Sequence, residues 1–222
     1  MNRYFLTATA ALLVSGAASA TTLYSDRAAF NAAGSGSGFS TDLNNLGSTR
    51  PLPFSFGPMA ISGTFGTAMY WGSEWAQNIA GVNGNVDGTA WIQLRLNTFN
   101  GPVTWTNDTA FQLLGFDVRA YFDNVGVNDG GESVRYIADT GETGSFSLPA
   151  TNTAAFVGIA FDAPVTSVSF SIGADHVNGF TWYGVDNLQV WARAAPVPEP
   201  ATWGLMMGGI GLLAAAMRRR SV

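Results

Sequence analysis

The sequence has no cysteine, no lysine and only one histidine among its 222 residues. Without cysteine the chain can form no disulfide bond and has no thiol for nucleophilic catalysis. A zinc site built on histidines lacks ligands, because His176 is the only candidate. A serine nucleophile paired with His176 would also lack the Gly-x-Ser-x-Gly turn that presents the serine in many hydrolases. These absences predict a protein that is not an enzyme.

Charge is also scarce, at 11% of the residues, and most of it is negative. Residues 21–195 contain six arginines and fourteen acidic residues. This balance argues against nucleic acid or anionic lipid as a partner, whereas it permits the binding of cations. Glycine, serine, threonine, asparagine and aromatic residues are abundant, which is typical of an extracellular β-protein.

The first twenty residues have the three parts of a secretory signal peptide. Arg3 provides the positive charge, residues 5–14 form an apolar stretch, and Ala18-Ser19-Ala20 is a small-residue cleavage site. We therefore expect a signal peptide at 1–20 and an exported domain at 21–195. About 175 residues are enough for one domain with a sizeable core.

The C-terminal tail combines a Pro-Glu-Pro triplet, an uncharged apolar run at 201–217 and three consecutive arginines. Seventeen residues in a helix span about 25 Å, close to the thickness of a bilayer core. We predict a transmembrane helix at 201–217 whose arginine end lies in the cytoplasm. The precursor would then be anchored in the inner membrane with its domain in the periplasm. The tail is either a permanent anchor or a signal that is recognised and removed.

The three-part pattern resembles the PEP-CTERM sorting signal of Gram-negative bacteria. The residues that carry the resemblance are Pro198, Glu199, Pro200, Arg218, Arg219 and Arg220, with a glycine-rich apolar run between the two groups. The resemblance covers 196–222 and implies processing by an exosortase, a membrane-embedded cysteine protease. It also implies delivery to the cell surface or extracellular matrix, where proteins with such tails are often associated with exopolysaccharide.

Local patterns predict one helix followed by strands. Residues 24–33 favour a helix that Ser25 or Asp26 caps and Gly34 ends, and residues 34–38 have the composition of a flexible linker. Short strands separated by turn residues are expected beyond this point, with Pro164 beginning one of them. The predicted strands are 59–65, 89–96, 103–106, 111–122, 132–138, 144–148, 154–161, 165–172 and 180–192. This pattern predicts an all-β, antiparallel, jelly-roll-like sandwich with one short N-terminal helix.

Two groups of acidic residues are candidate calcium ligands. Asp123 and Asp129 lie in an oxygen-rich stretch at 123–132, although such a stretch is more often a plain hairpin turn. Residues 156–170 and 184–190 resemble the closing strands of carbohydrate-binding jelly rolls, and that resemblance implies that Asp186 helps to hold a structural calcium ion. The alternative for Asp186 is a turn carboxylate bonded to the backbone. No other cofactor is expected.

Tryptophans offer a candidate surface for sugars, because indole rings stack on the C–H faces of carbohydrates. Trp71, Trp75 and Trp182 stand in polar, glycine-rich contexts, although tryptophans in a sandwich core would give the same composition. Glu74, Glu132 and Glu142 are the candidates for a pair of glycosidase carboxylates, and each is more simply a loop or strand-end acid.

These observations predict an exported surface or matrix protein with a structural role associated with exopolysaccharide. The alternative is a calcium-dependent carbohydrate-binding module, and a hydrolase is the least favoured class.

Overall fold

The computed structural model describes residues 21–44, 50–63, 68–71, 86–87, 89–97, 101–123, 133–150, 153–172, 180–194 and Gly209. The elements in chain order are β1 (Thr22–Tyr24), α1 (Arg27–Ala33), β2 (Gly34–Thr41), β3 (Arg50–Pro51), β4 (Phe54–Phe56), β5 (Met59–Ser62), β6 (Ala68–Trp71), β7 (Trp91–Asn97), β8 (Val103–Asp123), β9 (Ser133–Ala138), β10 (Thr143–Ser147), β11 (Ala154–Ile172) and β12 (Phe180–Arg193). Every strand pairing among the described residues is antiparallel, as the sequence predicts.

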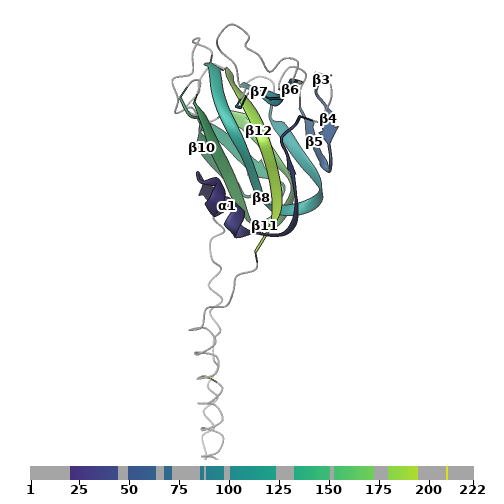
Figure 1. Cartoon of the computed structure of the whole chain (residues 1–222), viewed down its shortest axis with the longest axis vertical. Coiled ribbons are helices and arrows are strands. Elements are labelled where there is room, and N and C mark those ends of the chain that lie inside the picture. The colour runs from purple at the N-terminus through teal and green to yellow at the C-terminus, as the bar shows by residue number, and fades with distance from the viewer. Residues whose placement is uncertain are drawn as a thin grey trace, which may run out of the picture.

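Two long strands, β8 and β11, take part in both layers of the sandwich (Figure 1). The first part of β8 pairs with β5 and with the second part of β11, which continues to β9 and β10. The second part of β8 pairs with the first part of β11 and with β12, which continues to β2, β7 and β6. Because β8 folds across the core, its own Trp105 and Phe116 face each other with ring centroids 5.3 Å apart.

The core fills the space between these layers with alternating apolar side chains. In β7, Ile92, Leu94 and Leu96 are fully buried, as the period-two pattern of that segment predicts. In β11, Val168 and Phe170 are buried beside partly exposed serines. The predicted antiparallel sandwich is therefore confirmed.

The helix α1 packs on the outer face of the layer that contains β8, β11 and β12. Asp26 caps its start by accepting a 2.7 Å hydrogen bond from the backbone N–H of Ala29, so the predicted helix and one of its two predicted caps are confirmed. The buried ring of Phe30 rests directly on the sheet backbone. A Cβ at Gly115 would lie 2.7 Å from this ring, and one at Gly158 would lie 2.5 Å from it. Gly115 and Gly158 therefore leave the space in which Phe30 packs the helix onto the sheet.

Two local predictions were wrong. Residues 34–38 are part of strand β2 and pair with β12, so they are no linker. Tertiary packing outweighs their composition, because Gly38 lies against the indole of Trp191 where any Cβ would be 2.5 Å from the ring. Pro164 does not begin a strand but lies inside β11, at the corner where its register with β8 shifts.

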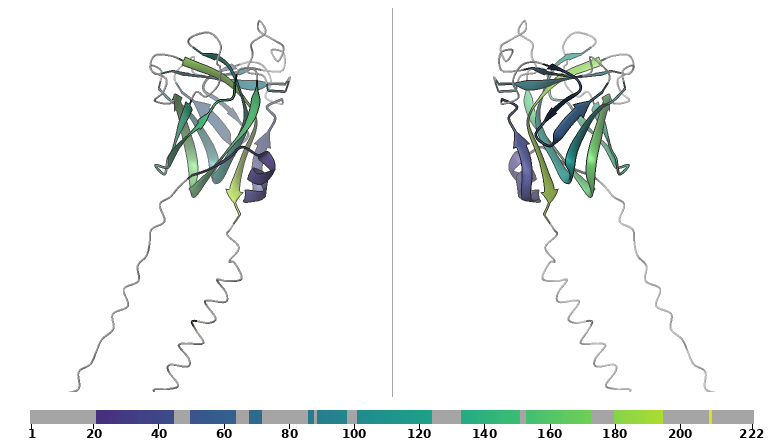
Figure 2. Two further views of the ribbon diagram at one scale, coloured as in Figure 1. Left: turned by 90° about the vertical axis from the view of Figure 1, so that its left-hand side faces the viewer. Right: turned by 90° about the vertical axis from the view of Figure 1, so that its right-hand side faces the viewer.

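The described chain begins and ends at the same end of the sandwich (Figure 2). Thr22 in β1 lies opposite Ala160 in β11. Arg193, the last residue of β12, forms a 3.5 Å ion pair with Asp162, two residues along β11. We call this end of the sandwich the tail end.

None of the helices that the structure describes is long and apolar enough to cross a membrane. The predicted membrane helix at 201–217 lies outside the described residues, apart from Gly209.

Candidate binding site at the β12 bulge

A β-bulge interrupts the pairing of β12 with β8. Asp186 lies opposite Asp117, whereas Gln189 lies opposite Gly115, so β12 has one more residue than β8 across this interval. Asn187 absorbs the extra residue with a φ of 51°, a left-handed conformation that asparagine tolerates better than most residues. The bulge turns Asn187 toward Asp117, and its side-chain amide donates a 2.9 Å hydrogen bond to that carboxylate.

Asp186 is the buried carboxyl group at the start of this bulge, with none of its surface exposed. Its Oδ1 accepts a 2.6 Å hydrogen bond from the backbone N–H of Asn187, and its Oδ2 accepts a 3.3 Å bond from the hydroxyl of Thr89. Burial raises the pKa of Asp186 to about 8, and the nearby charges of Asp87 and Asp117 add to the rise. The group is therefore mainly protonated at neutral pH.

Arg27 of α1 closes one side of the bulge. Its guanidinium lies 2.6 Å from the carboxylate of Asp117 and 4.4 Å from the ring centre of Phe156, in a cation–π arrangement. About a third of the arginine side chain and a fifth of the aspartate side chain remain exposed. The ion pair joins the helix to β8 and leaves both groups accessible from the surface.

An open pocket of about 550 Å³ lies above the bulge. Its walls come from α1, β2, β8 and β12 and consist mostly of hydrogen-bonding side chains: Arg27, Ser40, Thr41, Asp42, Asp117, Asn187, Leu188 and Gln189. The Oε1 atom of Gln189 is buried and has no hydrogen-bond partner in the described part of the chain. The arrangement can receive a ligand rich in hydroxyl groups.

Two of the three predicted metal ligands, Asp123 and Asp186, lie in described strands. Asp123 lies opposite Thr181, five residues along β12 from Asp186, which corresponds to about 17 Å. Asp129 lies outside the described residues. Within the part of the chain that the structure describes, histidines and acidic residues form no group of three or more that could hold a metal ion. Asp186 accepts a hydrogen bond from the backbone N–H of Asn187.

Of the three tryptophans predicted to bind sugar, two lie in described strands. Trp71 of β6 lies opposite Trp91 of β7, and Trp182 of β12 lies opposite Arg95 of β7. Partners across a ladder lie on the same face of the sheet, and successive residues of a strand alternate between its two faces. The backbone positions of Trp71 and Trp182 therefore belong to the face opposite to that of Ile92. Trp75 lies outside the described residues.

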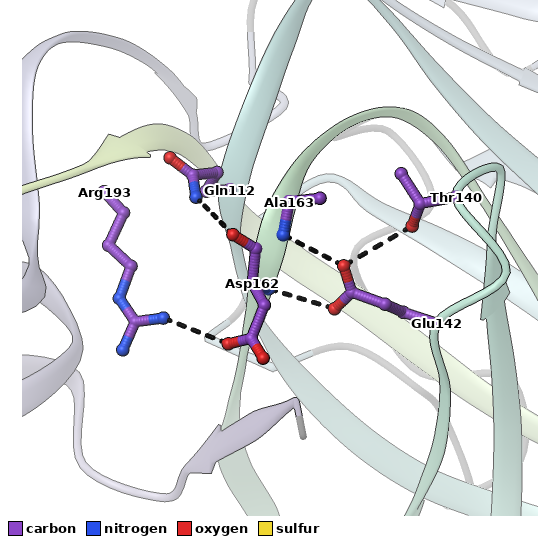
Figure 3. Close-up of polar contacts among 6 residues, drawn as sticks. All are labelled: Gln112, Thr140, Glu142, Asp162, Ala163 and Arg193. Atoms are coloured by element: carbon purple, nitrogen blue, oxygen red, sulfur yellow. Dashed lines mark hydrogen bonds and ion pairs between the residues drawn. The ribbon is translucent and has the colours of Figure 1, made fainter. Parts of the chain in front are cut away.

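Glu142, a candidate acid, has a structural role at the corner of β11 (Figure 3). Its carboxylate accepts hydrogen bonds of 2.9 and 3.0 Å from the backbone N–H groups of Asp162 and Ala163. On the other side of the corner, Gln112 donates to the carbonyl of Asp162, and Arg193 donates to the carboxylate of Asp162. The other candidates, Glu74, Glu132 and His176, lie outside the described residues.

Sequence reasoning missed the pocket above the bulge. Its residues come from four elements between positions 27 and 189, and only the register of β2, β8 and β12 brings them together. The pair Asp186-Asn187, in a segment with strand character, is the one local signal of a bulge.

Comparison with known proteins identifies the tail. A family model described as the PEP-CTERM protein-sorting motif matches residues 196–220. The chain therefore carries this motif at its C-terminus, and the six sorting residues predicted from the sequence fall inside the match. No curated protein matches the chain.

Solved structures with a similar architecture are carbohydrate-binding modules. A mutant of a family 29 module is 12% identical and covers 69% of this chain and 92% of its own, with a TM-score of 0.32. A CBM29-2 mutant complexed with mannohexaose is 13% identical, covering 72% and 99%, with a TM-score of 0.34. TmCBM61 in complex with β-1,4-galactotriose is 11% identical, covering 62% and 90%, with a TM-score of 0.29. Likeness at this level transfers neither a ligand nor a site.

Proposed function

We propose that this chain is an exported protein of the cell surface or extracellular matrix, whose β-sandwich has a structural role associated with exopolysaccharide. The observation that carries the proposal is the PEP-CTERM motif at 196–220, which begins two residues after the described part of the sandwich ends. Such a tail is processed by an exosortase. The sandwich is the part that remains, and its partner is extracellular polysaccharide.

The geometry of the sandwich supports this role. Both described ends of the domain lie at the tail end, so attachment there leaves the opposite end and both faces available for contacts (Figure 2). The described surface around the β12 bulge is polar and hydrogen-bonding, which suits contact with a hydrated polysaccharide.

The test compares the fate of the full chain in a bacterium that has an exosortase and in the same strain without it. We expect a decrease in mass and release from the inner membrane only when the exosortase is present. The variant Glu199→Ala should block both changes, whereas Asp108→Ala, which removes an exposed carboxylate of the sandwich, should not. Release without the exosortase would contradict the proposal. Binding of the released protein to purified exopolysaccharide tests the second part of the proposal, which is the association with exopolysaccharide.

A second candidate function is a calcium-dependent carbohydrate-binding module, and the bulge pocket is the observation that favours it. The hydrogen-bonding side chains that line the pocket suit sugar hydroxyls. We would measure thermal unfolding with calcium and with EDTA, then glycan-array binding on the same sample. A higher melting temperature with calcium, together with glycan binding that Gln189→Leu removes, would favour the module. No calcium effect and no glycan signal would eliminate it.

A further inference from the structure

The charges on the walls of the bulge pocket do not cancel. Arg27, Asp42 and Asp117 are the charged residues among the described ones that line it. The guanidinium of Arg27 lies 2.6 Å from the carboxylate of Asp117, so these two charges compensate each other. Asp42 takes part in neither of the ion pairs among the described residues, which are Arg27–Asp117 and Arg193–Asp162. One uncompensated negative charge therefore remains on the described wall.

Arg27 is committed to contacts within the protein. Besides the ion pair, its guanidinium lies 4.4 Å from the ring centre of Phe156. A ligand with a carboxylate would have to separate Arg27 from Asp117, which would leave a half-buried aspartate without its counter-charge. The pocket therefore disfavours an anionic ligand, even though it contains an arginine.

Asp42 follows directly after β2, where the chain turns. The next residue, Leu43, has a φ of 62° and a fully buried side chain, which anchors the turn in the core. Asn44 donates a 3.2 Å hydrogen bond from its backbone N–H to Oδ1 of Asp42. Because charges interact over several ångströms, the Asp42 carboxylate affects a ligand in the pocket whether or not the two are in contact.

We propose that the bulge pocket selects saccharides with free amino groups over neutral sugars and over uronic acids. The ammonium group of such a sugar supplies the positive charge that the wall lacks, while hydroxyl groups bond to polar side chains such as Ser40 and Asn187. The volume of about 550 Å³ lies within the range for small-molecule sites. This inference rests on carbohydrate binding at the bulge pocket, the second candidate function above, and it names the class of substrate.

Fluorescence anisotropy of short labelled saccharides tests the selection. The probes are the trimers of glucosamine, N-acetylglucosamine and galacturonic acid, each with a fluorophore at its reducing end. The full chain would be held in a nonionic detergent without a sugar headgroup, so that the detergent cannot compete. The buffer is at about pH 5, where sugar amines are protonated and ordinary carboxylates are ionised. It contains calcium, because the module on which the inference rests is calcium-dependent.

We expect the glucosamine trimer to bind about threefold to fivefold more tightly than the N-acetylglucosamine trimer, as one charge interaction at an exposed position allows. The galacturonic acid trimer should bind most weakly. Asp42→Asn should remove the preference for the free amine, and it keeps the Oδ1 acceptor for the N–H of Asn44. The control Asp108→Asn removes the same charge from an exposed residue that does not line the pocket, and it should keep the preference.

Two kinds of result would overturn the selection and leave the pocket a carbohydrate site. The first is binding of the N-acetylglucosamine or galacturonic acid trimer at least as tight as that of the glucosamine trimer. The second is a preference that survives in Asp42→Asn, or that falls equally in Asp108→Asn, which would assign it to the acidity of the whole domain. The absence of binding by all three trimers would contradict the carbohydrate function itself, and the selection with it.

Discussion

At the scale of single residues, Asp186 makes stability depend on pH. Its pKa of about 8 in the folded chain is far above the ordinary value near 4, so the folded state holds a proton that the unfolded state has lost. Between about pH 4 and pH 8 stability should therefore fall as pH rises, with a limiting slope of about 1.4 kcal/mol for each pH unit. Urea unfolding at pH 5 and at pH 8 measures this difference.

The matched variants isolate the contribution of Asp186. Asp186→Asn is neutral at every pH and should remove most of the slope. Asp108→Asn changes an exposed carboxylate and should leave the slope as it is. An unchanged slope in the Asp186 variant would show that another group causes the dependence.

Gly158 has a different role, because it provides room for the ring of Phe30. A Cβ at this position would lie 2.5 Å from the ring, so Gly158→Ala should displace α1 and cost about 1–3 kcal/mol of unfolding free energy. Gly34→Ala is the control, since its Cβ would meet its nearest neighbour at 3.4 Å and lose little. Thermal unfolding measures the stability of both variants. Equal stability would contradict the expectation that a side chain at position 158 displaces Phe30 and α1.

At the scale of elements, the corner of β11 depends on a side chain from outside the strand. Glu142→Ala removes the acceptor of two backbone N–H groups, so we expect a loss of about 1–2 kcal/mol. Thr140→Ala removes only a 3.5 Å contact to the same carboxylate and should cost much less. Urea unfolding measures both variants. A loss as small in Glu142→Ala as in Thr140→Ala would show that solvent replaces the carboxylate.

Local patterns predicted the elements well where one face is buried. The alternation in β7 and the capping of α1 by Asp26 are both local signals, and both are confirmed. The two long strands were each predicted as two shorter ones, because the residues at their corners have turn character. Residues 162–164, Asp-Ala-Pro, continue as a strand, and the distant Glu142 accepts hydrogen bonds from two backbone N–H groups there.

The candidate sites were less predictable from the sequence, because they depend on contacts between residues that are far apart in the chain. Asp123 and Asp186 are both candidate ligands by residue type, yet the register of β8 and β12 separates them. Conversely, Arg27 and Asp117 are 90 positions apart and form an ion pair. Sequence alone gives residue chemistry, and long-range register decides which groups meet.

At the scale of the whole molecule, the position of the tail predicts an orientation. From Arg193 at the tail end, β12 runs to Phe180 at the opposite end, about 40 Å away (Figure 1). In the membrane-anchored precursor that the sequence predicts, a probe near Arg193 should therefore lie much closer to the bilayer than one near Phe180. The absence of native cysteine makes this measurable with single-cysteine variants.

We would label Asp162→Cys at the tail end and Asn97→Cys, which lies opposite Phe180. A quencher attached to lipid headgroups should quench the first label strongly and the second weakly, because quenching falls steeply within about 10–20 Å and the strand is about 40 Å long. Equal quenching would mean that the sandwich lies flat on the membrane.

The antiparallel neighbours of β12 determine how the molecule responds to mechanical load. A protein attached at Arg193 and gripped at the other end of the sandwich is pulled along the axis of β12. This strand pairs with β8 on one side and with β2 and β7 on the other. The pull therefore acts in shear on two rows of hydrogen bonds at once, and these bonds share the force. Traction on this domain would meet far more resistance along β12 than across it.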